Sequence, residues 1–276
     1  MTKPIMNVAS ETILATVINR LPQSLFISGE HGVGLGTISK YIADLRKVTP
    51  IIVLPEKDEK VDIDKGVISV EIIRRLYDET RTKAVGERII IIDYAERMTH
   101  QAQNAFLKLL EEPGQGIHFI LVSHSAAKML PTILSRTENI DIKPITTKQS
   151  QQLLDNMGAT DAVKRSQLLF MADGLPAELT RLANDADYFE KRSTTVRDAR
   201  ELLRGNVYQK LLIAHKYKDD RALALTLLLD ASRILKQTII ANPQTDTLNR
   251  VDLILNAYQQ IEANGNIRLC LARMVI

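Results

Sequence analysis

The chain contains a single cysteine, Cys270, and no tryptophan. One thiol excludes an intrachain disulfide and a cysteine-based zinc cluster. Aromatic residues make up only 4% of the chain, which argues against a surface that stacks single-stranded bases on aromatic rings. No apolar run of the sequence approaches the roughly 20 residues of a membrane span, and the N-terminal stretch lacks the hydrophobic core of a signal peptide. We therefore expect a cytoplasmic globular protein without a membrane partner.

The charge is nearly balanced, with a net value of +3 over 276 residues. From residue 195 onward there are 12 Lys and Arg against 8 Asp and Glu, a local balance of +4. Such a small excess is more typical of a solvated helical surface than of a nucleic-acid-binding face. The length allows two or three domains.

Short runs rich in β-branched residues alternate with helix-length segments in the first half of the chain. The expected strands are residues 25–28, 51–54, 89–93, 117–123 and 140–142. This alternation predicts an α/β fold, a parallel sheet wrapped by helices. The run RIIIID, residues 88–93, is apolar at consecutive positions, so we place it in the middle of the sheet, buried on both faces.

Beyond residue 144 the strand signals stop and helical patterns follow. We expect Thr147 to cap a first helix, a second helix over residues 161–172, and a third from Pro176 toward Phe189. Leucine spacing from Thr194 onward predicts several longer amphipathic helices that pack together. The expected organisation is an α/β core over residues 1–144, a small helical lid over 145–193 and a helical C-terminal domain over 194–276.

Residues 24–40, SLFISGEHGVGLGTISK, have the order strand, glycine-rich turn and helix that a phosphate-binding loop requires. Leu35 occupies the place of the usual lysine, and Gly36 that of the magnesium-binding Ser or Thr, while Thr37 comes one position too late. The four glycines could equally make only a tight turn. Any nucleotide or anion would be held weakly, by backbone N–H groups. The candidate binding residues are Gly29, Gly32, Gly34, Gly36 and Thr37.

Asp93 ends the expected strand RIIIID, where a carboxylate would coordinate Mg²⁺ in a nucleotide-hydrolysing site. The next residue is Tyr94, where a glutamate would polarise the attacking water. A phenol with a pKa near 10 is a poor general base at neutral pH. With the loop lysine also missing, the sequence predicts a site that does not hydrolyse nucleotide and binds it weakly or not at all. No dedicated metal site is expected.

Residues 89–136, from IIIIDYAERM through NAFLKLLEEP to LVSHSAAKMLPTILSR, resemble clamp-loader subunits of the AAA+ class, most closely the delta-prime type of bacterial DNA polymerase III. The resemblance implies an AAA+ core, a lid and a collar-like C-terminal domain. It also implies a place in a hetero-oligomer with a gamma/tau-type ATPase and a delta-type subunit, acting on a sliding clamp and primed DNA.

Within this resemblance, Ser135 and Arg136 match the pair that presents an arginine finger to ATP on a neighbouring subunit. Ser123 and His124 match the first sensor region. Ala177 stands in the lid where active relatives carry an arginine. The resemblance thus implies a subunit of the DNA polymerase III holoenzyme that lends a cation without intrinsic ATPase activity.

Two other functions remain open. The chain could be an autonomous ATPase in which Lys40 or Thr37 replaces the missing groups of the loop. It could also be a DNA-binding adaptor that uses its mildly basic helical C-terminal part.

Overall fold

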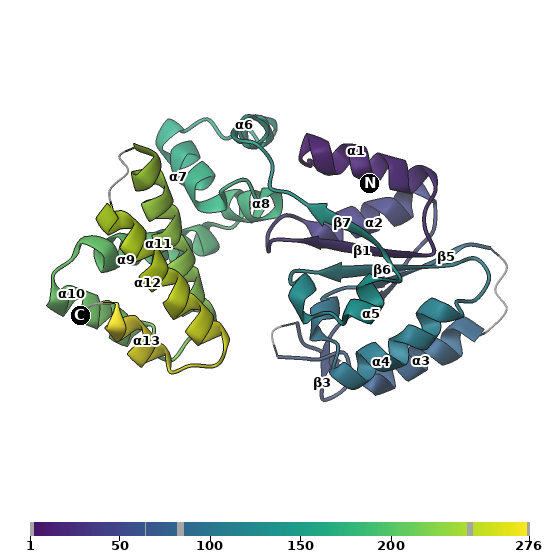
Figure 1. Ribbon diagram of the computed structural model, residues 1–276. Coiled ribbons are helices and arrows are strands. Elements are labelled where there is room, and N and C mark those ends of the chain that lie inside the picture. The colour runs from purple at the N-terminus through teal and green to yellow at the C-terminus, as the bar shows by residue number, and fades with distance from the viewer. Residues whose placement is uncertain (1–2, 64, 82–85, 242–244, 275–276) are drawn as a thin grey trace. The chain divides into compact units, whose positions relative to one another are not determined.

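The computed structural model describes residues 3–63, 65–81, 86–241 and 245–274. The chain divides into two compact units, Met1–Arg181 and Leu182–Ile276. The first contains the sheet, and the second is helical (Figure 1). The expected boundary at residues 193/194 lies inside one continuous helix, so the three-part division remains a prediction.

The first unit is built on a parallel sheet with the strand order β2-β5-β6-β1-β7. All five expected strands are present. The middle position belongs to β6, with β5 beside it, which corrects the expectation for residues 88–93. Both strands are apolar and buried, so a continuous apolar run identifies an interior strand but does not rank it. The strands are β1 Ser24–Gly29, β2 Ile51–Val53, β5 Arg88–Ile92, β6 Ile117–Ser123 and β7 Glu138–Ile142.

Helices cover both faces of this sheet. Leu25 and Ile27 point from β1 into the cluster formed with α1 and α2, whereas Phe26 points into the opposite cluster with α3 and α4. The glycine-rich turn between β1 and α2 follows the last residue of β1, so it lies at the carboxyl edge of the parallel sheet. The helices are α1 Val8–Asn19, α2 Leu35–Leu45, α3 Val70–Arg81, α4 His100–Glu111 and α5 Pro131–Leu134. Shorter elements are a hairpin, β3 Glu56–Lys57 and β4 Lys60–Val61, and two 3-10 turns, η1 Ala95–Arg97 and η2 Ala126–Lys128.

Three helices follow the last strand: α6 Thr147–Asn156, α7 Ala162–Ala172 and α8 Pro176–Asn184. Thr146, rather than the expected Thr147, caps α6, because Thr146 and Gln149 satisfy each other's backbone N–H groups. The expected helix from Pro176 to Phe189 is also corrected. It ends at Asn184, since the Asp185 side chain accepts a hydrogen bond from the Tyr188 N–H and starts the next helix.

The second unit is a helical bundle in which α11 packs between α9 and α12, and α10 packs against α9 and α13. Among the described residues, no helix is both long enough and apolar enough to cross a membrane. The helices are α9 Ala186–Arg204, α10 Val207–Lys216, α11 Arg221–Ala241, α12 Thr245–Glu262 and α13 Ile267–Arg273.

Candidate nucleotide loop and arginine site

The glycine-rich turn after β1 contains two glycines in a left-handed backbone conformation. Gly32 and Gly34 have φ angles of +90° and +93°, values that side-chain-bearing residues rarely adopt. Gly34 caps α2, and its carbonyl oxygen accepts hydrogen bonds from the N–H groups of Thr37 and Ile38. A Cβ on Gly29 would lie 2.8 Å from the carbonyl oxygen of Ile142 on β7. The glycines are therefore required by the turn itself.

Leu35, which takes the place of the lysine, does not face the loop opening. Its side chain is 1% exposed and belongs to the hydrophobic cluster between the sheet and α2. A buried leucine stabilises the strand-helix junction but offers no charge to a phosphate. Thr37 and Lys40 are exposed on α2. The residues of the loop therefore do not match the cation and hydroxyl set that a nucleotide with Mg²⁺ requires.

The first turn of α8 lies directly on the loop. The N–H groups of Ala177 and Glu178 both donate to the carbonyl oxygen of Gly32, with N···O distances of 2.9 and 3.2 Å. A Cβ built on Gly32 would lie 2.9 Å from the Cβ of Glu178. These bonds satisfy N–H groups at the N-terminus of α8 that otherwise have no intrahelical partner. The first turn of α8 therefore contacts the loop through hydrogen bonds from Ala177 and Glu178 to Gly32.

Asp93 follows β5 and faces the same loop. Its Oδ1 accepts a hydrogen bond from the Tyr94 N–H at 3.0 Å, and its Oδ2 lies 3.4 Å from where a Cβ on Gly36 would be. Burial raises the pKa of the Asp93 carboxyl. The hydrogen bond from the Tyr94 N–H and the nearby His124 and Lys40 lower this pKa, but their effect is smaller. Glu96 adds to the rise in pKa, and its own Oε2 is buried with no hydrogen-bond partner among the described residues.

Two histidines, His31 from the loop and His124 after β6, stack beside Asp93. Their ring centroids are 3.8 Å apart with an angle of 24° between the planes, and Tyr94 approaches the ring of His124 at 5.6 Å. His124 donates from Nδ1 to the carbonyl oxygen of Gly29 at 3.1 Å. Burial lowers the pKa of His31, and the neighbouring His124, Arg97 and Lys128 lower it further. The sequence analysis missed this pair, because 93 positions separate the two residues and neither position carries a pairing signal.

Arg136 lies away from this loop, at the exposed end of α5. Its guanidinium binds Glu111 at the end of α4, with Nη2–Oε1 and Nε–Oε1 distances of 2.8 and 3.1 Å, and donates from Nη1 to the carbonyl oxygen of Thr132. The side chain of Arg136 is 41% exposed. Ser135 donates to the same Thr132 oxygen at 3.2 Å. An exposed ion pair of this kind contributes about 1 kcal/mol or less, so a stronger anion could replace Glu111.

The structure thus separates the predicted residues into two groups. Gly32, Gly34, Gly36 and Asp93 meet at the loop, whereas Ser135 and Arg136 form a separate surface feature. Among the described residues, no three His, Cys, Asp or Glu side chains are arranged as a metal site would need.

Several comparisons with known proteins find subunits of bacterial DNA polymerase III. A family model described as "DNA polymerase III, delta subunit" matches residues 47–146. The delta-prime subunit of Bacillus subtilis (strain 168) is 21% identical over 216 residues, which cover 69% of this chain and 65% of that protein. The delta-prime subunit of Yersinia pestis is 37% identical over 87 residues, 31% of this chain and 24% of that protein. The chain is therefore similar to clamp-loader subunits of the delta-prime type.

Human replication factor C subunit 5 is also similar, with 24% identity over 81% of the delta-prime-like chain and 65% of that protein. Among solved structures, a gamma-subunit-related protein of DNA polymerase III from Thermotoga maritima superposes with a TM-score of 0.54 at 20% identity, covering 96% of this chain and 97% of that one. A RuvB variant from the same organism gives 0.50 at 13% identity, covering 98% and 88%. These likenesses confirm the AAA+-like fold. The chain spans 65% of the length of its B. subtilis relative.

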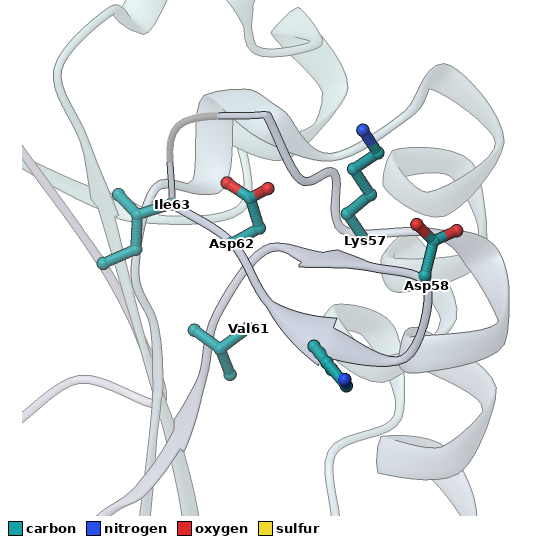
Figure 2. Close-up of a pocket in the computed structure, with 6 residues that line it drawn as sticks. Lys57, Asp58, Val61, Asp62 and Ile63 are labelled. Atoms are coloured by element: carbon teal, nitrogen blue, oxygen red, sulfur yellow. The ribbon is translucent and has the colours of Figure 1, made fainter.

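A surface hollow of about 630 Å³ lies on the β3–β4 hairpin of the delta-prime-like chain, outside the loop and the arginine feature (Figure 2). Five of its six lining side chains are exposed, and Asp62 is half-buried. Basic, acidic and aliphatic side chains alternate around it, so the hollow has no consistent charge that would select a ligand. Its lining residues are Lys57, Asp58, Lys60, Val61, Asp62 and Ile63.

The contact between α8 and the loop predicts the effect of Gly32→Ala. The added Cβ must displace Glu178, and the φ of +90° strains the backbone, so the two hydrogen bonds to Gly32 should weaken. We expect the amides of Ala177 and Glu178 to exchange with deuterium about five times faster than in the parent chain, as for a loss of ~1 kcal/mol. Gly158→Ala is the matched control, because Gly158 has a φ of +70° with nothing within 4 Å of an added Cβ. Equal exchange in both variants would contradict the contact.

Proposed function

We propose that the delta-prime-like chain is a non-hydrolysing subunit of a clamp loader and that it completes a neighbouring ATPase site with Arg136. The observation that carries the proposal is the exposed guanidinium at the end of α5, which is bound by the exposed Glu111 and by the carbonyl oxygen of Thr132. A planar cation with several donors at a surface suits the charge that develops on phosphate oxygens. Ser135, at the C-terminal cap of α5, sets the backbone from which Arg136 projects.

The geometry of the chain's own loop supports an idle role for it. Leu35 is buried in the core, Tyr94 follows Asp93, and α8 donates hydrogen bonds to Gly32. In this proposal the loop holds no nucleotide tightly, and the glycines serve the turn alone. The strand-helix junction keeps its shape without nucleotide because protein contacts take the place of the phosphate.

The proposed partners follow from the relatives. Clamp-loader subunits of two kinds, delta-prime and tau/gamma, are among the similar proteins. We propose that this chain joins a gamma/tau-type ATPase and a delta-type subunit in the cytoplasm, and that the assembly loads a sliding clamp onto primed DNA. Substitution of Arg136 in the assembled loader tests the proposal.

One observation favours the autonomous ATPase as a second candidate. Lys40 lies close enough to influence the pKa of Asp93, so a cation is present near the loop. The variant Asp93→Asn separates the two functions. In a working site it would remove the Mg²⁺ ligand and abolish turnover by the isolated chain. In an idle site it should only relieve the burial of a charge, while the amide oxygen still accepts the Tyr94 N–H.

For the idle site we therefore expect Asp93→Asn to be more stable than the parent at pH 7, by about 1–3 °C in melting temperature. The pKa of Asp93 is raised in the folded state, so the parent loses stability as pH rises through that pKa. The gain should accordingly shrink as pH falls toward 4. Two measurements distinguish the idle site from the autonomous ATPase. They are thermal melts across this pH range and calorimetric titration of the isolated chain with ATP and Mg²⁺. Micromolar ATP affinity that Asp93→Asn abolishes would favour the autonomous ATPase.

A further inference from the structure

The solvent side of α9 carries a row of arginines over the C-terminal half of the helix. Arg197, Arg200 and Arg204 are exposed, and at about 100° per residue they lie within about 60° of one another around the helix axis. Ala199 and Leu202 are buried on the opposite side, in the bundle where α9 packs against α10 and α11. The three arginines, called here the arginine ridge, extend over about 10 Å of the helix.

The positive charge of the second unit is concentrated around the arginine ridge. Residues 197–218 contain six Lys and Arg against two Asp and Glu, so they account for the whole excess of +4 found from residue 195 onward. One of the two acids, Asp198, is buried and already bound within the bundle. The other, Glu201, lies at the margin of the ridge. The ridge is therefore a cationic surface and not a balanced mixture of charges.

The stability of the helix explains only part of this pattern. A cation in the last turn, here Arg204, is favourable beside the partial negative charge of a helix C-terminus, but the effect falls off within that turn. Arg197 lies about two turns earlier. Neither Arg197 nor Arg204 has an ion-pair partner among the described residues. Their guanidinium groups are therefore available to an anion from outside the chain.

The arginine ridge lacks the apolar centre that a protein partner would cover. Within α9, which the structure describes in full, no large apolar or aromatic side chain is exposed. Protein interfaces have apolar centres with few charges, whereas interfaces with nucleic acid are polar and strongly positive. Arginine also donates two parallel hydrogen bonds to a phosphate. A single strand fits less well than a duplex, because the ridge offers no aromatic ring on which an unpaired base could stack.

We propose that the arginine ridge of α9 binds the phosphate backbone of double-stranded nucleic acid without reading its sequence. Phosphates of one strand follow each other at about 3.4 Å along the duplex axis, so the ridge matches roughly three of them. Such contacts release the counterions of the phosphates, and the affinity should therefore fall steeply with salt. This contact is separate from the role of Arg136 and does not depend on it.

Replacing the three arginines of the ridge by glutamine tests this contact. The triple variant Arg197→Gln, Arg200→Gln and Arg204→Gln removes the charges and keeps a similar helix propensity. The measurement is fluorescence anisotropy of a labelled duplex of about 20 base pairs, titrated with the full chain at about 50 to 200 mM salt. For the parent, log affinity should fall against log salt with a slope of about −3. The triple variant should bind at least about tenfold more weakly at the lowest salt and lose most of this slope.

The matched control is Lys191→Gln with Lys236→Gln and Arg250→Gln, which removes three exposed cations of the same unit from outside the ridge. Both triple variants have the same net charge, so a general electrostatic attraction would weaken equally in both. Binding at the ridge instead leaves the control within about threefold of the parent. Circular dichroism verifies that both variants fold.

Three results would overturn the inference: no duplex binding by the parent at about 50 mM salt, parental binding by the ridge variant, or equal weakening in the ridge variant and the control. Tighter binding to a single strand, or equal binding to a polyglutamate peptide, would overturn the duplex as the occupant. Arg136→Ala should bind the duplex as the parent does, since Arg136 lies in the first unit. ATP turnover by the Arg136→Ala loader tests the proposed function separately, so either proposal can fail while the other stands.

Discussion

Replacing Arg136 by alanine is expected to lower ATP turnover at the adjoining site of the assembled clamp loader by about 10³-fold or more, the range found for arginine fingers. The guanidinium is 41% exposed and is bound by Glu111 and by the carbonyl oxygen of Thr132, so part of it is accessible to a phosphate from a neighbour. Its loss removes a cation that acts mainly on the charge of the transition state. The measurement is DNA-stimulated phosphate release by the reconstituted loader, with single-turnover kinetics to isolate the affected site.

Two further variants sharpen this result. Arg136→Lys keeps the charge but loses the planar fork of donors, so turnover should recover only in part. Glu111→Gln removes the negative charge beside the guanidinium and leaves the guanidinium itself, so turnover should stay within a few-fold of the parent. Assembly should survive all three changes. An Arg136→Ala loader that assembles and hydrolyses ATP at the parental rate would contradict the proposed role.

The local features of the fold could be predicted from the sequence because each has a local cause. β-branched runs predicted the five strands of the sheet. Leu35 stands where a loop lysine would be, and its side chain is buried in the core. The end of α8 was also readable in principle. Asn184 and Asp185 interrupt the pattern before Phe189 with residues that favour caps. Similarly, Gln149 lies three residues after Thr146, the spacing of a capping box.

The contacts that define the candidate site could not be predicted, because they join distant parts of the chain. The hydrogen bonds from α8 to Gly32 span about 145 positions, and nothing in either segment specifies the other. The stacking of His31 on His124 likewise depends on how β1 and β6 pair in the sheet. The order of strands within the sheet has the same origin. Such features follow from tertiary packing, which periodicity in one segment does not encode.

Replacing Asp230 by alanine is expected to destabilise the second unit by about 3–5 kcal/mol. Asp230 is fully buried on α11 and receives two hydrogen bonds from Arg192 of α9, with N···O distances of 2.6 and 2.9 Å. Arg233 approaches the same carboxylate at 3.4 Å. The substitution would remove the Asp230 carboxylate from the Arg192 guanidinium, whose side chain is 8% exposed. Hydrogen exchange of α9 and α11 amides in increasing urea reports this loss without interference from the first unit.

The matched control is Asp219→Ala in the same unit, because Asp219 is 86% exposed and lies 3.9 Å from Lys218. It should change the free energy of unfolding by less than about 1 kcal/mol. The double variant Arg192→Met with Asp230→Leu removes both charges and keeps apolar volume, so it should recover most of the stability that Asp230→Ala loses. A double variant as unstable as Asp230→Ala would show that the Arg192 charge does not account for the loss of stability, and would point to the other contact of Asp230, with Arg233. Equal stability of Asp230→Ala and the parent would contradict the buried pair.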